Sequence, residues 1–245
     1  TTGTKVHSRG SVQHTGVNTM QVQDYLRWCD DIGMFATDRP INSIGDTEGS
    51  CNHRTPFCDE TCYNIKLYKM YPNMAIKDIR NEDVWQNIKP MQVKDLISRK
   101  KKQTKRVRHC TRGEGIKDEA DIWKHKAEAE AIPDSVIWIP TRAWRDPTLN
   151  FLIRTVLFPI KNIAMNASVD PSNTKEEWAM LERQGWNIMF YGDDSLEESP
   201  ATGKRLFDCP KTKKGLKGHC TICKAGCFSQ VTMDRQQIVK LYQHT

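Results

Sequence analysis

Apolar and polar residues alternate through the middle of the chain in a pattern that predicts strands and helices in turn. Three short apolar runs have the length of buried strands, and the segments between them have helical periodicity, with Ser172 placed to cap the last helix. The strands are expected at residues 135–140, 161–168 and 186–191, and the helices at 117–131, 147–157 and 172–184. Strand centres about one βα unit apart predict an α/β fold with a parallel sheet, open or barrel-like.

Shorter elements are expected on either side of this region. Pro72 should end the helix that begins near Asp59, because proline cannot continue a helix. The strand before the turn Arg-Gly-Glu-Gly should be short. In chain order the expected elements are a helix at 20–34, a helix from 59 to 71, two helices within 76–99, a strand at 107–111 and a short helix at 236–242.

The composition allows a sizeable core, since 38% of the 245 residues are hydrophobic. A mean hydropathy of −0.66 argues against a membrane protein. No apolar run reaches the roughly 18 residues that a membrane-spanning helix needs. Residues 1–18 lack the apolar stretch of a secretory signal, so we predict a cytoplasmic protein with no membrane partner.

The chain has nine cysteines, a high number for a protein without a secretory signal, and they suggest a specific chemical role. In a reducing cytosol a disulfide framework is not expected, and an odd count cannot pair completely. Metal binding or redox chemistry is therefore the leading interpretation of the cysteines.

The first cysteine group has the pattern Cys51-x6-Cys58-x3-Cys62. Thiolates are soft ligands that suit iron–sulfur clusters and zinc. Cys58 and Cys62 are four residues apart, so one helical turn would place both sulfurs on one side. Three cysteines leave a fourth metal position open or filled from elsewhere, and a catalytic metal needs an open position.

The second group, Cys209-x10-Cys220-x2-Cys223-x3-Cys227, offers the four thiolates of a 4Fe–4S cluster or a structural zinc. A zinc ribbon usually has two CxxC pairs, and this segment has one, which favours a cluster with zinc as the alternative. Cys29 and Cys110 are isolated and are interpreted as packed thiols. Three histidines near cysteines are possible substitute ligands, although surface or core histidines are more common; they are His53, His109 and His219.

Basic residues are concentrated between Arg99 and Arg108, where seven of ten are Lys or Arg. Such a run can bind nucleic acid through its phosphates, or it can be an ordinary solvated surface. The candidate nucleic-acid contacts are Lys100, Lys101, Lys102, Lys105, Arg106 and Arg108.

Residues 51–64, CNHRTPFCDETCYN, resemble a cysteine motif of a family of bacteriophage proteins. Members of that family also end in Cys-Pro followed by a tight group of three cysteines. Here this ending corresponds to Cys209-Pro210 with Cys220, Cys223 and Cys227. The resemblance implies a viral protein that acts in the host cytoplasm.

The wider organisation resembles the radical S-adenosylmethionine (SAM) superfamily, whose members carry three cysteines after the first strand of a partial β/α barrel. In that superfamily the open iron of the cluster chelates SAM, and a Gly-Gly-Glu-like segment after the second strand contacts the SAM amino group. The resemblance implies that Gly113 and Glu114 bind the cofactor and that the second cysteine group holds an auxiliary cluster. The spacing here is Cx6Cx3C rather than CxxxCxxC, and Gly113 has no glycine beside it.

Polar residues also follow the later strands, at the edge where parallel β/α folds bind ligands. Arg142, Asn166 and Ser168 are the cofactor-binding candidates among them. The expected organisation is an arm and helix over 1–40, a partial β/α barrel over 41–195 and a cysteine-rich auxiliary-cluster region over 196–245.

Three functions fit these features. One is a radical-SAM-like enzyme that needs a reductant for its cluster. The second is a nucleic-acid-binding protein with structural metal sites, and the third is an electron-transfer or redox-sensing module.

Overall fold

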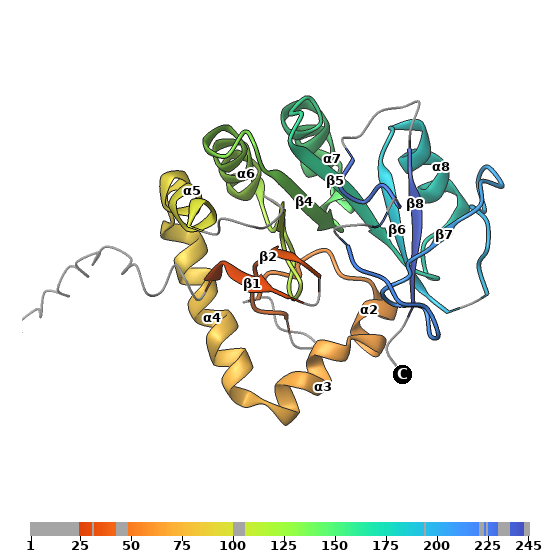
Figure 1. Ribbon diagram of the computed structural model, residues 1–245. Helices are drawn as coiled ribbons and strands as arrows, with labels where there is room; N and C mark the ends of the chain where they lie inside the picture. The colour runs from red at the N-terminus through yellow and green to blue at the C-terminus, as the bar shows by residue number, and fades with distance from the viewer. Residues whose placement is uncertain are drawn as a thin grey trace, which may run out of the picture.

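The structure is a computed structural model that describes residues 25–30, 32–42, 49–99, 106–193, 195–220, 223, 225–229 and 236–242. An α/β arrangement is visible in Figure 1, with one twisted sheet and helices packed against it. The predicted lysines at 100, 101, 102 and 105 lie outside the described residues. None of the described helices is long and apolar enough to cross a membrane.

The sheet has eight strands in the order β1-β2-β3-β4-β5-β6-β8-β7, and every neighbouring pair is parallel except β1 and β2. The predicted parallel sheet is therefore confirmed. Its order among the described residues is open, with β1 and β7 at the edges, so closure into a barrel is not shown. The strands are β1 (Arg27–Cys29), β2 (Met34–Ala36), β3 (Arg106–Arg108), β4 (Val136–Thr141), β5 (Ile163–Val169), β6 (Asn187–Gly192), β7 (Phe207–Asp208) and β8 (Ile238–Tyr242).

Prolines begin four of the helices, because proline fits the first helical turn, where its missing N–H is not needed. Most of the helices lie within a few residues of their predicted positions. The helices are α2 (Pro56–Thr61), α3 (Tyr63–Met70), α4 (Pro72–Asn87), α5 (Pro90–Ser98), α6 (Glu119–Ala131), α7 (Pro147–Leu152) with a π-helical turn (Ile153–Leu157), and α8 (Lys175–Arg183), with a 3-10 turn at Ala143–Arg145.

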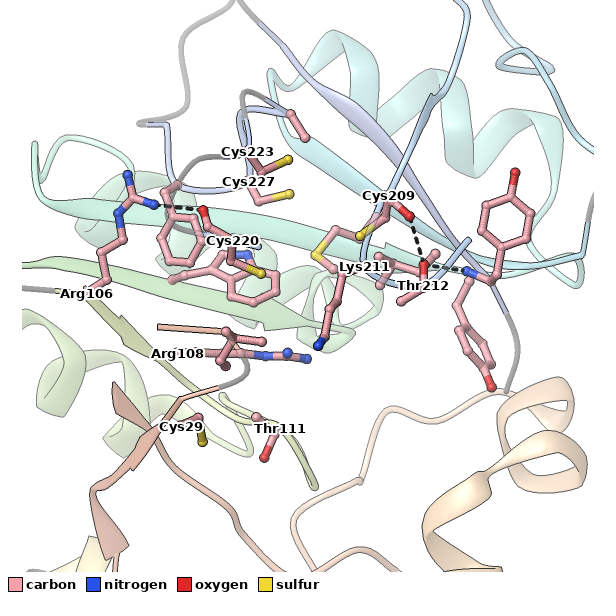
Figure 2. Close-up of a pocket in the computed structure, with 18 of the residues that line it drawn as sticks. Cys29, Arg106, Arg108, Thr111, Cys209, Lys211, Thr212, Cys220, Cys223 and Cys227 are labelled. Carbon is pink, nitrogen blue, oxygen red and sulfur yellow. Dashed lines mark hydrogen bonds between the residues drawn. The ribbon is translucent and has the colours of Figure 1, made fainter. Parts of the chain in front are cut away.

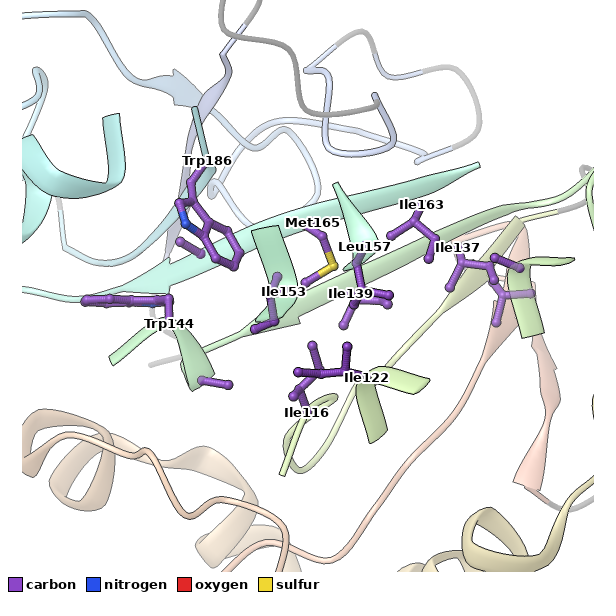
Figure 3. Close-up of a cluster of buried hydrophobic side chains, with 14 of the residues drawn as sticks. Ile116, Ile122, Ile137, Ile139, Trp144, Ile153, Leu157, Ile163, Met165 and Trp186 are labelled. Atoms are coloured by element: carbon purple, nitrogen blue, oxygen red, sulfur yellow. The ribbon is translucent and has the colours of Figure 1, made fainter. Parts of the chain in front are cut away.

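The two faces of the sheet are covered differently. On one face, alternate residues of β4 and β5 pack with α6 and the π-helical turn, as Figure 3 shows for Ile139, Met165 and Ile122. On the other face Trp138 and Met189 pack against Phe228 and Cys227 of the cysteine-rich segment. Side chains on consecutive strand residues point to opposite faces, so β4 supplies both layers.

Two predicted helices are wrong. Residues 27–29 and 34–36 form the antiparallel strands β1 and β2, and β2 pairs with the distant β3 through Phe35 and Val107. Residues 238–242 form β8, which inserts between β6 and β7 with Ile238 opposite Ile188. Short apolar runs do not distinguish a strand from a helix, and pairing with a distant strand decided both cases.

The cap of α8 is also different from the prediction. Thr174, not Ser172, caps the helix: its hydroxyl accepts a hydrogen bond from the Glu177 N–H at 3.2 Å, and the Glu177 carboxylate accepts one from the Thr174 N–H at 2.9 Å. This reciprocal capping box satisfies two N–H groups at once. Ser172 instead donates to Asp170 at the end of β5.

Candidate metal and cofactor site

The loop and helix that carry the first cysteine group are tied to the sheet by Thr55. Its hydroxyl accepts from the Cys58 N–H at 3.0 Å, so it caps α2, and donates to Asp170 at 2.5 Å. Asp170 in turn is 2.8 Å from the guanidinium of Arg142, which follows β4. The start of α2, and Cys58 with it, is therefore held at the carboxyl ends of β4 and β5.

Gly113 allows the Cys51 loop to approach the end of β3. Its φ is +75°, and a Cβ there would lie 2.6 Å from both the Arg39 carbonyl oxygen and the Ser50 hydroxyl. The Ser50 hydroxyl accepts from the Glu114 N–H at 2.9 Å and donates to the Pro40 carbonyl at 2.7 Å. Only glycine fits this contact without strain. The Gly113-Glu114 segment therefore positions Ser50, the residue before Cys51.

Glu114 lies beside the first cysteine group, and its carboxylate already has backbone partners. It is 7% exposed and accepts hydrogen bonds from the N–H groups of Gly115 and Arg142, each at 2.9 Å. Burial raises its pKa, and these hydrogen bonds oppose the rise. It also accepts from the Ile116 N–H at 3.4 Å and from the Thr141 side chain. A carboxylate has about four acceptor positions, so Glu114 joins the β3 and β4 ends, and a ligand would have to compete with these donors.

A cavity of about 210 Å³ brings the first group and four of the five cofactor candidates together. Its walls include Cys51, Cys58 and Cys62, with Gly113, Glu114, Arg142 and Ser168. Asn166 is not among the described residues that line it. Asn166 is buried on β5 and donates to the Cys227 carbonyl at 3.1 Å, so it supports the second cysteine group instead.

Two thiols of the first group, those of Cys51 and Cys58, are held in an environment that disfavours free thiolates. Burial raises the pKa of Cys51 to about 12, and the nearby Glu114, Cys58 and Cys62 raise it further. Burial also raises the pKa of Cys58, against the opposing charge of Arg142. Metal ions bind the thiolate form, so binding at this site would release protons.

The four cysteines of the second group also converge, as Figure 2 shows around one region of a larger cavity of about 570 Å³. Cys209 is anchored through its N–H to the Lys240 carbonyl on β8 at 2.9 Å. Burial raises the pKa of Cys227 to about 12, and Cys209, Cys223 and Cys220 all add to the rise. The four thiols are thus close enough to interact electrostatically.

The two cavities share part of their walls. Tyr63, Arg108, Met189 and Tyr191 line both. Arg108 lies 4.5 Å over the Trp138 ring, and its charge opposes the rise that burial causes in the pKa of Cys220. The two cysteine groups therefore border one hollow region, which extends from the carboxyl ends of the parallel strands over the sheet face that Trp138 and Met189 occupy.

Two members of the predicted nucleic-acid run have their side chains in this region. Arg106 donates to the Cys220 carbonyl at 3.0 Å and lies 4.8 Å over the Phe228 ring, and Arg108 stacks on Trp138. These contacts arise because β3 lies between β2 and β4 in the sheet. The number of basic residues in the run does not predict this position. Arg106 and Arg108 are thus placed at the cysteine-lined cavity, and nucleic-acid binding through the lysines stays a prediction.

The isolated cysteines and histidines have other surroundings. Cys29 and Cys110 are buried, as their interpretation as packed thiols requires. His53 contacts the Lys117 carbonyl and His219 the Asp30 carbonyl. His109 is part of a buried cluster that sequence reasoning missed, with His125 and Glu128.

In that cluster, His109 and its neighbour His125 lower the pKa of Glu128 to about 2, although burial alone would raise it. The i, i+3 spacing of His125 and Glu128 within a predicted helix was a signal that could have found two of the three residues.

Fold and site together define a mixed α/β protein whose mainly parallel sheet brings two cysteine groups to adjoining cavities. The chain belongs to the family described as Gene product 88, whose profile matches residues 34–230 and so includes both cysteine groups. This match agrees with the predicted resemblance to a bacteriophage family, and it gives no support to the radical-SAM resemblance. No curated protein and no solved structure matches the chain.

Proposed function

We propose that the protein is an iron–sulfur protein whose two cysteine groups each bind a cluster beside a shared cavity, where a substrate is transformed. The observation that carries this proposal is the common wall of the two cavities, formed by residues such as Arg108 and Tyr191. The groups are separated in sequence by residues 63–208, so their meeting at one hollow is a property of the fold.

The spacing of the thiols supports clusters over zinc. Zinc holds four thiolates at about 2.3 Å, which puts the sulfurs about 3.8 Å apart in a tetrahedron. Among the described residues, no three cysteine thiols lie within 4.8 Å of one another. A cluster of several iron and sulfide atoms separates its thiolates more widely than one zinc ion does, and the single CxxC pair of the second group also favours a cluster over a zinc ribbon.

Positive charge around the cavities also supports anionic clusters. Arg142 opposes the burial-driven rise in the pKa of Cys58, and Arg108 and Lys211 do the same for Cys220. Thiolate-ligated clusters carry net negative charge, which buried cations stabilise at short range. Cations near each group are therefore suited to such a cofactor.

SAM is the cosubstrate that this arrangement supports best, and an external reductant would then be needed. Three thiolates in the first group leave one iron of a four-iron cluster without a cysteine ligand, and Glu114, Arg142 and Ser168 line the same cavity. Bound there, such a cluster supplies one-electron chemistry. An electron-transfer or redox-sensing module is the alternative, and it needs no SAM.

The first test is the metal content of protein purified without oxygen. Wild-type protein should contain iron and acid-labile sulfide. Cys58→Ala/Cys62→Ala should lose the iron and sulfide of one cluster and keep its fold. Cys110→Ala is the matched control, because Cys110 is buried and lines the same cavity. Stoichiometric zinc without sulfide would contradict the proposal. Loss of the cluster in Cys110→Ala would show a fourth thiolate ligand and exclude SAM chelation.

A second prediction concerns Glu114 and SAM. If its carboxylate accepts a hydrogen bond from the SAM ammonium group, Glu114→Gln should weaken SAM binding by roughly 10- to 100-fold, since a charge-assisted bond contributes about 1.5–3 kcal/mol. Isothermal titration of cluster-loaded protein measures this effect. Glu119→Gln, on the exposed first turn of α6, is the matched control.

Iron and sulfide should be unchanged in both Glu114→Gln and Glu119→Gln. Unaltered SAM affinity in Glu114→Gln would remove Glu114 from the site. No SAM binding by the cluster-loaded wild type would favour the electron-transfer alternative.

A further inference from the structure

A buried group of nitrogen and oxygen ligands lies where β3 meets α6, outside both cysteine groups. His109 follows β3, and His125 and Glu128 are neighbours on α6. The three side chains are 1%, 0% and 3% exposed, and one ligand atom from each lies within 4.8 Å of the others. Buried polar groups of this kind need partners, because their desolvation is costly.

The hydrogen bonds of His125 leave one of its nitrogens without a partner. Its Nε2 is 2.8 Å from the Gly115 carbonyl oxygen, so this nitrogen carries the proton and donates. Its Nδ1 then presents a lone pair toward Glu128 Oε2 at 3.6 Å and is buried without a hydrogen bond. At 3.6 Å a shared proton would make at best a poor hydrogen bond.

His109 completes the arrangement. Its Nε2 is 2.8 Å from the same Glu128 Oε2, and its Nδ1 is 3.1 Å from the Thr37 hydroxyl. Nε2 is also 3.1 Å from Glu128 Oε1, so in one tautomer its proton is shared with that carboxylate. When Nδ1 donates to Thr37 instead, the Nε2 lone pair faces the carboxylate and can act as a ligand. Each imidazole therefore has its second nitrogen held by an oxygen acceptor, which is how proteins orient metal-binding histidines.

We infer that His109, His125 and Glu128 bind a single divalent transition-metal ion. Two imidazoles and one carboxylate suit zinc or ferrous iron, and soft thiolates take no part. The ion would replace the proton that His109 and Glu128 share, and it would also satisfy the unbonded His125 Nδ1. It would link the end of β3 to α6, a role independent of whether the cysteine groups bind iron.

A cavity borders one member of the site. A cavity of about 260 Å³ reaches Glu128 and is bordered by Trp85, Trp123 and Lys124. Trp85 also packs against both imidazole rings, with centroids 5.4 Å from His109 and 4.9 Å from His125. Trp85 thus restricts the orientation of both imidazole rings.

Cobalt is a suitable probe because its spectrum distinguishes thiolate from nitrogen and oxygen ligands. The full chain, with its cysteine sites first loaded with iron and sulfide, should bind one further equivalent of Co²⁺. The bound ion should show ligand-field absorption without a thiolate-to-cobalt charge-transfer band. His125→Gln/Glu128→Gln removes two ligands together with the buried charge. Its cobalt affinity should fall by more than the roughly 10- to 100-fold that loss of a supporting hydrogen bond costs.

The matched control is Lys126→Gln/Glu130→Gln, an ion pair on the solvent side of the same helix, with side chains 42% and 65% exposed. It should bind cobalt as the wild type does, and iron and sulfide should be the same in all three proteins. Cobalt binding that survives in the ligand variant, or that always shows thiolate charge transfer, would overturn the inference.

If the ligand variant does not fold, zinc X-ray absorption on the wild type decides. A nitrogen and oxygen shell at about 2.0–2.1 Å supports the site, and sulfur alone at about 2.3 Å overturns it.

Discussion

Cys220→Ser/Cys223→Ser should lose the folded state of the C-terminal region together with its metal. The described residues between Cys209 and Ser229 make few backbone hydrogen bonds beyond their own turns, the Cys209 bond to Lys240 being the main exception. Ala225 is the one buried hydrophobic residue among them. A segment with so little core cannot offset its conformational entropy, so metal binding must supply the folding free energy, about 10–16 kcal/mol in small zinc domains.

Unfolding of the C-terminal region should also affect the sheet that this region covers. Phe228 and Cys227 pack on Trp138 and Met189, so release of the segment would expose that apolar face. Limited proteolysis and dye binding to exposed apolar surface should both increase in the variant. Cys58→Ser/Cys62→Ser is the matched control, since Thr55 caps α2 and contacts Asp170 without metal. A variant as protease-resistant as the wild type would show that the tail folds by itself.

Arg39→Met should give the largest loss of stability of any single substitution away from the cysteines. The Arg39 guanidinium is buried and contacts Glu82 at 2.6 Å and Asp121 at 2.7 Å. Asp121 is 1% exposed, so without Arg39 its charge would be buried without a cation. Breaking a buried pair in this way costs about 3–5 kcal/mol in the free energy of unfolding, measured by denaturant titration.

The pH dependence of this loss follows from Asp121. Burial tends to raise the pKa of Asp121, but the charge and hydrogen bonds of Arg39 lower it below its ordinary value. The stabilisation is therefore present above the unfolded pKa of about 3.9 and disappears as pH falls through the lower folded pKa. The difference in stability between wild type and Arg39→Met should shrink below about pH 4.

Two further variants separate the buried charge from other effects of the substitution. Arg39→Met/Asp121→Asn should recover part of the lost stability, because it removes the unpaired charge. Lys126→Ala breaks an exposed pair with Glu130 and should cost no more than about 1 kcal/mol. A loss below about 1 kcal/mol in Arg39→Met would mean that Asp121 is satisfied by Trp85 and the Lys117 N–H alone.

Much of the candidate site could be predicted from sequence because its signals are local. Three cysteines within twelve residues, and four near the C-terminus, identify both groups by spacing alone. Gly113 and Glu114 were singled out by a dipeptide at the end of a strand, and the fold places them beside Cys51. Asn166, also a predicted cofactor-binding residue, donates to the Cys227 carbonyl, and its position on a strand did not indicate which loop would cover it.

The sequence by itself determined the helices and strands of the middle region, since hydrophobic periodicity and proline positions act within a few residues of each other. Only the tertiary structure decided that 238–242 is a strand beside β6 and that Arg108 stacks on Trp138 between the cysteine groups. It also decided the meeting of His109 with His125 and Glu128. These features depend on contacts between segments far apart in the chain, whose free energy comes from burial and pairing that no local pattern records.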